Sequence, residues 1–302
     1  MTKHSIAGED LYQWKNWAVQ LAKENNVDAS EIDWLLQGLT SLSSLSLRLG
    51  DYRDQKIISS KVSITTLEEK WHQRINNRVP VQYLVGDTPW RNFSLTVTPD
   101  VLIPRPETEL IIDIVKEMIE QSPIRDRLIE GQWADLGTGS GAITLALAHQ
   151  FPQATIHAVD ISDKAIAIAQ LNAQQNNLAN RIQFHQGSWL DPLSILKGQL
   201  AAIISNPPYI PTQTVLTLQP EVEKHEPHLA LDGGTDGLDS IRQIITQGAL
   251  YLQPNGLWLI ELMAGQARAV KTLLINQNSY ANIQIHQDLS GIQRFVSARK
   301  AL

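Results

Sequence analysis

Four consecutive residues have a distinctive chemistry: Asn206, Pro207, Pro208 and Tyr209. They follow the apolar run 200–205, which predicts a buried strand of a parallel sheet that the two prolines end. Asn206 would then lie at the carboxyl end of a strand, where open α/β sheets place their ligands. Its side-chain carbonyl and the main-chain carbonyl of Pro207 are two acceptors suited to one planar NH2 group, beside the aromatic face of Tyr209. An ordinary Asn-Pro turn would explain the prolines, but not the buried strand before them.

A glycine-rich turn forms a second candidate site, made of Gly137, Thr138, Gly139, Ser140 and Gly141. It lies between a hydrophobic stretch around Trp133 and the helical pattern of residues 143–148. Glycines at such a turn let the backbone approach a ligand closely. Asp160 follows the next predicted strand, residues 155–159, where it would accept hydrogen bonds from a ribose. NAD enzymes and S-adenosylmethionine enzymes share both features. Because the motif at Asn206 has no role in hydride transfer, the two motifs together favour S-adenosylmethionine.

The composition predicts a folded chain without a membrane segment. With 302 residues, of which 43% are hydrophobic and 19% charged, the chain is long enough for one large and one small domain. The lack of cysteine excludes disulfides, cysteine-ligated zinc and thiol nucleophiles. A net charge of −6 without a long basic run argues against an extended nucleic-acid footprint. Since neither a signal peptide nor an apolar run of membrane-spanning length is present, we expect a cytoplasmic protein.

The chain should divide into three segments. In residues 1–85 the apolar side chains recur at helical spacing, which predicts a small helical domain. Because it has no catalytic motif of its own, we expect this domain to recognise the substrate by a contact distant from the candidate sites. Residues 86–100 predict a β-hairpin linker, with its strands within residues 89–98. Residues 101–302 form the large domain and contain both candidate sites.

Strands and helices alternate from Gln132 onward, which predicts a mostly parallel sheet with helices on both faces, the Rossmann-like α/β architecture. A helix from about Glu107 to Glu120, with Pro106 in its first turn, should precede this sheet. The last two strands should pair antiparallel. The seven expected strands lie around Trp133 and at residues 155–159, 181–185, 200–205, 256–261, 283–286 and 294–298.

Several segments together resemble the HemK/PrmC family, the protein N5-glutamine methyltransferases that modify class I peptide chain release factors and modulate translation termination. The match covers nearly the whole chain. It is carried by residues 81–86, 102–109, 135–141, 206–210, 226–227 and 230–238. The asparagine motif alone occurs in many N-methyltransferases, so its combination with residues 103–109 is the more specific signal. One departure is His225, where family members commonly have an aromatic residue.

The resemblance implies a cofactor site for S-adenosylmethionine. The glycine turn would pass under the methionine end of the cofactor; its residues are Gly137, Thr138, Gly139, Ser140 and Gly141. Asp160 would hold the ribose, Trp189 would lie near the adenine, and Asn206 would border the same site. No metal is implied, because the sulfonium is already an activated methyl donor.

The resemblance also implies how the substrate binds. Asn206 and the carbonyl of Pro207 would receive the glutamine amide, while Pro208 and Tyr209 complete the binding motif. Two acceptors on the amide hydrogens would orient a nitrogen that is otherwise a poor nucleophile. The implied partner is a class I release factor, bound by a monomer that forms no stable complex with nucleic acid or membrane.

Other interpretations remain open at the level of the sequence. A flipped adenine or guanine presents the same NH2 group, so a nucleic-acid methyltransferase acting on adenine N6 or guanine N2 is the main alternative. A non-catalytic S-adenosylmethionine-binding protein is a third possibility, which the intact asparagine motif disfavours. Trp189 is equally compatible with packing, and Asp135 with tying down the glycine turn. Arg105, Glu107 and Glu226 are expected to support the site or to contact ligand.

Overall fold

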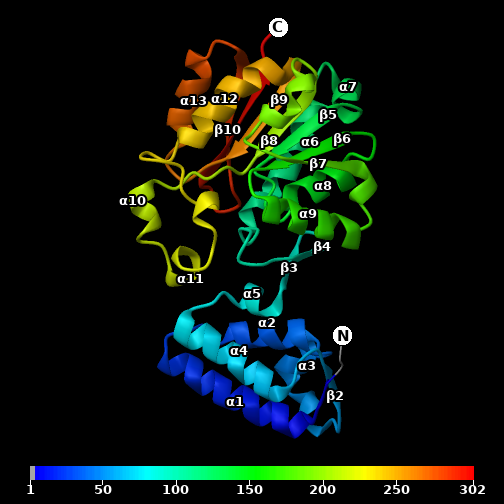
Figure 1. The fold of residues 1–302 in the computed structure, drawn as a ribbon, viewed down its shortest axis with the longest axis vertical. Helices are drawn as coiled ribbons and strands as arrows, with labels where there is room; N and C mark the ends of the chain where they lie inside the picture. The colour runs from blue at the N-terminus through cyan, green and yellow to red at the C-terminus, as the bar shows by residue number, and fades with distance from the viewer. Residues whose placement is uncertain (1–3) are drawn as a thin grey trace. The chain divides into compact units, whose positions relative to one another are not determined.

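The computed structural model describes residues 4–302, and the chain divides into two compact units (Figure 1). The first unit comprises residues 4–88 together with Gln219–His225. The second comprises Pro89–Leu218 and Glu226–Leu302. Within the described residues, no helix is both long and apolar enough to cross a membrane.

The first unit consists mainly of helices around a buried apolar cluster. Its elements are β1 (His4–Ile6), α1 (Gly8–Glu24), α2 (Ser30–Leu39), α3 (Ser44–Leu49), η1 (Asp51–Asp54), β2 (Ile58–Ser60), α4 (Ile64–Asn77), α5 (Val81–Val85) and α11 (Pro220–Glu223). Helix α1 buries Leu11, Trp14 and Ala18, which recur at helical spacing. The Ser63 hydroxyl caps α4 by accepting a hydrogen bond from Thr66 N at 3.1 Å. The antiparallel pair β1–β2 was not among the elements expected from the sequence.

The segment Gln219–His225 belongs to the first unit although it lies far along the chain. The guanidinium of Arg74 on α4 is buried and pairs with the carboxylates of Glu31 and Glu221. Its Nη1 lies 2.8 Å from Glu221 Oε1. A buried arginine needs such partners, because an unpaired charge is costly away from water. This ion-pair network therefore anchors α11 to α4.

The second unit is built on a seven-stranded sheet with the strand order β10-β11-β9-β8-β5-β6-β7. The strands are β5 (Gln132–Leu136), β6 (Thr155–Asp160), β7 (Ile182–Gln186), β8 (Leu200–Ser205), β9 (Leu252–Glu261), β10 (Tyr280–Gln287) and β11 (Gln293–Lys300). Strands β5 to β9 run parallel, whereas β11 is antiparallel to both of its neighbours. The predicted mostly parallel, seven-stranded sheet is confirmed. A two-stranded sheet of β3 (Asp87–Trp90) and β4 (Phe93–Thr96) precedes it. Its first strand begins at Asp87, two residues before the predicted range of residues 89–98.

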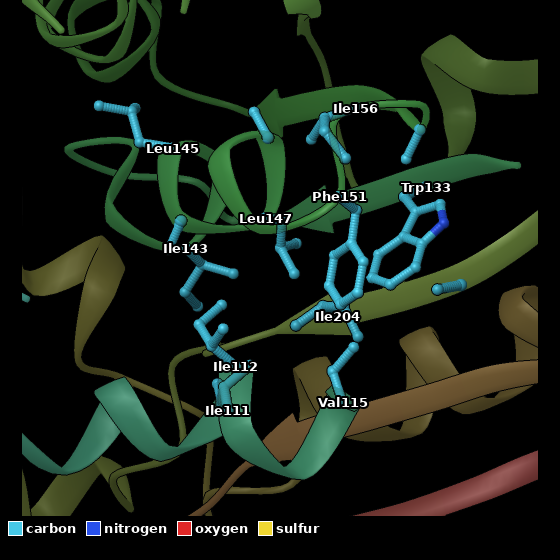
Figure 2. Packing of buried hydrophobic residues seen from close by; sticks show 14 of the residues in the cluster. Ile111, Ile112, Val115, Trp133, Ile143, Leu145, Leu147, Phe151, Ile156 and Ile204 are labelled. Atoms are coloured by element: carbon cyan, nitrogen blue, oxygen red, sulfur yellow. The ribbon is translucent and has the colours of Figure 1, made fainter. Parts of the chain in front are cut away.

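Helices cover both faces of this sheet (Figure 1). The helices and 3-10 turns of the second unit are η2 (Glu107–Glu109), α6 (Leu110–Glu120), α7 (Arg125–Ile129), α8 (Ala142–Gln150), α9 (Asp163–Gln175), η3 (Ala179–Arg181), η4 (Asp191–Leu196), α10 (Thr212–Val215), η5 (His228–Ala230), α12 (Asp239–Tyr251) and α13 (Ala267–Asn276). One core joins α6 and α8 to the sheet, and Figure 2 shows Trp133 and Phe151 packed there. Their ring centroids are 4.7 Å apart. A second core joins α12 and α13 to the sheet. The strand ends that position the candidate site are thus buried between two packed layers.

Candidate active site

The two sequence motifs meet at the point where the strand order reverses. Strands β5 and β8 are parallel neighbours, and their register pairs Leu136 with Ser205. The Ser205 hydroxyl also donates to the Leu136 carbonyl at 2.6 Å. The residues that follow these two positions are Gly137 and Asn206, so both motifs leave the sheet side by side. Open α/β sheets bind ligands at such a switch point.

A pocket of about 300 Å³ lies at this edge of the sheet. Its lining includes five of the predicted cofactor-site residues, Gly137, Gly139, Asp160, Trp189 and Asn206, as well as Pro208 of the asparagine motif. The rest of the lining comes from Asp100, Val101, Leu102, Val159, Ile161, Ser162, Ala165, Gly187, Ser188, Pro227, Leu229, Ala230, Asp232 and Ser240. Every lining residue belongs to the second unit.

The glycine turn divides into residues that line the pocket and residues that support it. Gly137 and Gly139 have φ of +73° and +54°, and a side chain at Gly139 would meet no atom of the described chain within 4 Å. The turn therefore presents bare backbone to open space, as a close approach to a ligand requires. Thr138, Ser140 and Gly141 are buried and are not among the lining residues. A methyl group at Gly141 would lie 3.2 Å from the Ala169 Cβ, so this glycine permits packing of α8 against α9.

Asp135 ties down the turn. It is fully buried, and its Oδ2 accepts hydrogen bonds from Thr138 Oγ1 at 2.8 Å and Thr144 Oγ1 at 2.6 Å. Burial raises the pKa of Asp135 to about 6. Asp135 is not among the pocket-lining residues, so the structure places it in the supporting role that its sequence position left open.

Asp160, at the end of β6, also binds the turn. Its Oδ2 accepts from Gly139 N at 2.9 Å and its Oδ1 accepts from Ser162 N at 3.0 Å. Burial raises the pKa of Asp160, while these backbone hydrogen bonds lower it. Each carboxylate oxygen has two lone pairs, so acceptor capacity remains toward the pocket that Asp160 lines. The sequence predicted the position of this carboxylate, but not its bonds to the turn.

Trp189 lies across the turn. The ring atom Cζ3 lies 3.7 Å from the position that a Cβ at Gly137 would occupy. Trp189 has a φ of +46°, which is unusual for a bulky residue and turns the chain just before η4. Its ring is partly buried and lines the pocket. A flat aromatic surface is therefore available beside the glycine turn.

The asparagine motif is held through its side chains. Asn206 Nδ2 donates to Thr108 Oγ1 at 3.2 Å, and the Tyr209 hydroxyl donates to Glu261 Oε1 at 3.1 Å. Thr108 Oγ1 in turn donates to Glu261 Oε2 at 2.6 Å. Burial and the nearby Glu261 carboxylate raise the pKa of Tyr209, so the phenol stays neutral. Pro207 and Tyr209, unlike Pro208, are not among the pocket-lining residues.

Sequence reasoning missed the importance of Thr108 and Glu261. Thr108 lies in the segment 103–109 that resembles the methyltransferase family, but the charged side chains of that segment, Arg105 and Glu107, are the more conspicuous candidates. Glu261 ends the apolar strand β9, and an acid in that place was a usable signal. Burial raises the pKa of Glu261, whereas the hydrogen bonds that it accepts lower it.

An ion pair supports the segment before α6. Arg105 Nη2 lies 2.7 Å and 2.9 Å from the two carboxylate oxygens of Glu226, which is buried. The Trp90 indole donates to the Arg105 carbonyl at 3.0 Å. Arg105 and Glu226 therefore pair with each other and are not among the pocket-lining residues. Glu107 begins the 3-10 turn η2 and is likewise outside the lining.

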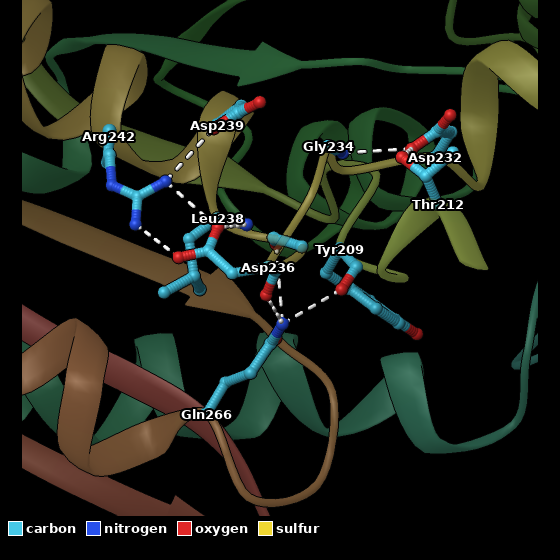
Figure 3. Close-up of polar contacts among 10 residues, drawn as sticks. Tyr209, Thr212, Asp232, Gly234, Asp236, Leu238, Asp239, Arg242 and Gln266 are labelled. Carbon is cyan, nitrogen blue, oxygen red and sulfur yellow. Dashed lines mark hydrogen bonds and ion pairs between the residues drawn. The ribbon is translucent and has the colours of Figure 1, made fainter. Parts of the chain in front are cut away.

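A loop after η5 packs against the backbone of the asparagine motif (Figure 3). Gln266 Nε2 donates to the Tyr209 carbonyl at 2.9 Å and to the carbonyls of Asp236 and Gly237 at 3.3 Å each. Gly237 has a φ of +76°, and a methyl group there would collide with the Tyr209 carbonyl oxygen. Arg242 pairs with Asp236, Nη1 to Oδ1 at 2.9 Å. These contacts hold the main chain at Tyr209 in one place.

The chain is similar to known methyltransferases in sequence and in fold. Residues 112–235 match the family model described as Methyltransferase small domain. A release factor glutamine methyltransferase of Synechocystis sp. is 51% identical over 299 residues, which cover 99% of both chains. A protein of the same name from Thermosynechococcus vestitus is 47% identical, over 97% of this chain and 99% of that protein. The solved catalytic domain of hMettl16, in complex with a hairpin of the MAT2A 3'UTR, shares the fold with a TM-score of 0.55, 13% identity and 88% coverage of each chain.

Proposed function

The chain belongs to the family of release factor glutamine methyltransferases. We propose that it transfers a methyl group from S-adenosylmethionine to the side-chain amide nitrogen, N5, of the glutamine in the Gly-Gly-Gln loop of class I release factors. One observation carries the proposal: Asn206, at the carboxyl end of β8, borders the same pocket as the glycine turn after β5.

The pocket fits S-adenosylmethionine. The open space before Gly139 and the left-handed backbone at Gly137 make a cradle that side chains would fill. Asp160 offers acceptors for ribose hydroxyls, and Trp189 offers an apolar face for the adenine. Thr138, Ser140 and Gly141 complete the turn. When bound, the cofactor supplies a methyl group on a sulfonium, an activated donor that needs no metal.

The asparagine motif would bind and orient the glutamine amide. Asn206 Oδ1 and the Pro207 carbonyl accept its two hydrogens, Pro208 lines the pocket beside them, and Tyr209 holds the motif through its bond to Glu261. An amide nitrogen is a poor nucleophile because its lone pair is delocalised into the carbonyl. Two fixed acceptors orient that nitrogen and favour the charge it gains as the bond to carbon forms. The neutral phenol of Tyr209 donates to Glu261, so it supports the motif and does not act as a base.

The substrate that we propose is a protein and not a nucleic acid. A flipped base would offer the same NH2 group. The net charge of −6 and the lack of a long basic run support a protein substrate. We accordingly propose a monomeric enzyme that acts in the cytoplasm, where release factors work, and forms no stable complex with nucleic acid.

Labelling with tritiated S-adenosylmethionine tests the proposal. A purified class I release factor should take up the label at the glutamine of its Gly-Gly-Gln loop, as located by mass spectrometry of its peptides. A release factor with that glutamine changed to alanine and the Asn206→Ala enzyme are the matched controls, and both should remain unlabelled. Label on duplex DNA or ribosomal RNA, with none on the release factor, would overturn the assignment.

A further inference from the structure

A chain of hydrogen bonds connects the pocket with a buried acid. Asn206 borders the pocket and donates to Thr108, which donates to Glu261. Thr108 and Glu261 are only 3% and 1% exposed. The other carboxylate oxygen of Glu261 accepts from the Tyr209 hydroxyl. Neither Thr108 nor Glu261 lines the pocket, and the reaction proposed above assigns no task to either.

The direction of these hydrogen bonds follows from Glu261. An ionised carboxylate only accepts, so Thr108 and Tyr209 must each donate their single hydroxyl hydrogen to it. Thr108 then has only lone pairs left for its other neighbour. The NH2 side of the Asn206 amide must therefore face Thr108, because a carbonyl in that place would set one acceptor against another. The carbonyl Oδ1 is the atom left for the pocket.

We propose that Glu261, acting through Thr108, is a positioning residue that holds the Asn206 amide with Oδ1 as the acceptor for the NH2 group of the substrate. The inference rests on the proposed function, since the orientation matters only for a substrate that donates at this place. A reversed Asn206 amide would turn its own donors toward those of the substrate. Because Tyr209 is bound to the same carboxylate, one acid orients two residues of the binding motif.

The charge of Glu261 depends on its surroundings. Burial raises its pKa, the hydrogen bonds from Thr108 and Tyr209 and the guanidinium of Arg294 on β11 lower it, and Glu107 on η2 raises it. The net direction is upward from the ordinary value of 4.5. As the pH falls through the raised pKa, the carboxyl gains a proton and becomes able to donate, so the orientation of the amide is lost. The rate constant kcat should therefore fall on the acid side.

Three substitutions in the full-length protein separate orientation from stability. Thr108→Val removes the hydroxyl at nearly constant shape, Thr108→Ser keeps it, and Glu261→Gln replaces an acceptor by a group that also donates. Methyl transfer to a Gly-Gly-Gln peptide should lose kcat on the order of 10²-fold in the valine and glutamine variants, as expected for a displaced reacting group. The KM for S-adenosylmethionine should stay unchanged, and the serine variant should keep most of the kcat.

Further readouts distinguish positioning from a structural role. Glu261→Gln removes a buried charge, so its Tm should be no lower than that of the wild type while the acid limb of its pH profile disappears. A serine variant as impaired as the valine variant would overturn the proposal, because the hydroxyl would then not be responsible. Wild-type kcat in both Thr108→Val and Glu261→Gln would overturn it as well.

Hydrogen exchange of the Asn206 side chain tests the bond itself, independently of activity. In protein labelled with 15N-asparagine, the Asn206 NH2 signal, assigned with Asn206→Ala, should exchange slowly in the wild type and in Thr108→Ser. It should exchange faster in Thr108→Val. If the exchange rates of the three proteins differ in this way but the wild type methylates no release factor, the proposed function is wrong and the positioning role of Glu261 stands. If the wild type methylates the release factor and Thr108→Val matches it in both rate and exchange, the positioning fails alone.

Discussion

Asn206 directly follows β8 and Asp160 ends β6 of the same sheet. We expect Asn206 to bind the substrate and Asp160 to bind the cofactor. Asn206→Ala removes an acceptor for the substrate, so the methyl-transfer rate should fall on the order of 10²-fold or more with little change in S-adenosylmethionine affinity. Asp160→Ala removes an acceptor for the cofactor and also the bonds to Gly139 and Ser162, so cofactor affinity should fall by about tenfold or more. Calorimetric titration with S-adenosylmethionine measures both affinities. A large affinity loss in Asn206→Ala alone would reverse the two assignments.

Asp135 makes stability depend on pH. Its pKa is about 6 in the folded chain against an ordinary value of 3.8, so the folded state binds this proton more tightly than the unfolded state. The free energy of unfolding should therefore fall as the pH rises from about 4 to about 6, by an amount on the order of 3 kcal/mol. Asp135→Asn carries no such charge, so urea unfolding should favour this variant over the wild type more at pH 8 than at pH 5. A difference that does not change with pH would contradict this account.

Which site residues can be predicted from the sequence depends on how far apart interacting residues lie along the chain. Asn206, Asp160 and the glycines stand next to strand ends, and a strand leaves a local pattern of apolar residues. Thr108 and Glu261 are 153 positions apart, and nothing local in either segment indicates the other. The role of Gly141 in packing against Ala169 is equally invisible before the helices are placed.

The loop between η5 and α12 packs against the main chain of the asparagine motif at Tyr209. Gly237→Ala should push the Tyr209 carbonyl aside, since the new methyl group would collide with it. Gly198→Ala is a matched control: its φ of +70° is close to the +76° of Gly237, but a methyl group there meets no described atom within 4 Å. Both variants should lose about 1 kcal/mol of stability from backbone strain. Only Gly237→Ala should also lose methyl-transfer rate, measured on the same peptide, and equal rates in the two variants would show that the loop does not position the motif.

Among the elements, the parallel strands were the easiest to predict. Buried strands of an α/β sheet are near-continuous apolar runs separated by helical patterns, so their order along the chain can be derived from periodicity alone. The pair β1–β2 was not predicted because each strand has only three residues, too few to show an alternation of apolar and polar side chains. The position of α11 in the first unit was not predicted because it depends on the ion pair of Glu221 with Arg74, which lies nearly 150 positions earlier.

At the scale of the whole molecule, the two units differ in what they offer a substrate. The pocket is lined only by residues of the second unit. A loop that enters a site of about 300 Å³ buries much less surface than the roughly 1,200 Å² of a stable protein complex. A release factor should therefore need a second contact, and the helical unit of residues 4–88 is free of pocket-lining residues. We propose that this unit recognises the protein substrate.

Removal of the helical unit tests this division of labour. A chain from Thr88 to Leu302 should fold and bind S-adenosylmethionine, because the sheet, both of its cores and every lining residue lie in it. Its segment Gln219–His225 loses the Arg74 anchor, so Glu221→Gln in the shortened chain removes the carboxylate left without a partner and is the control for that loss. Activity on a short Gly-Gly-Gln peptide should persist while kcat/KM on an intact release factor falls by at least about tenfold, the loss of about 1.4 kcal/mol of binding. Equal losses on peptide and on intact protein would mean that the helices stabilise the fold and do not recognise the partner.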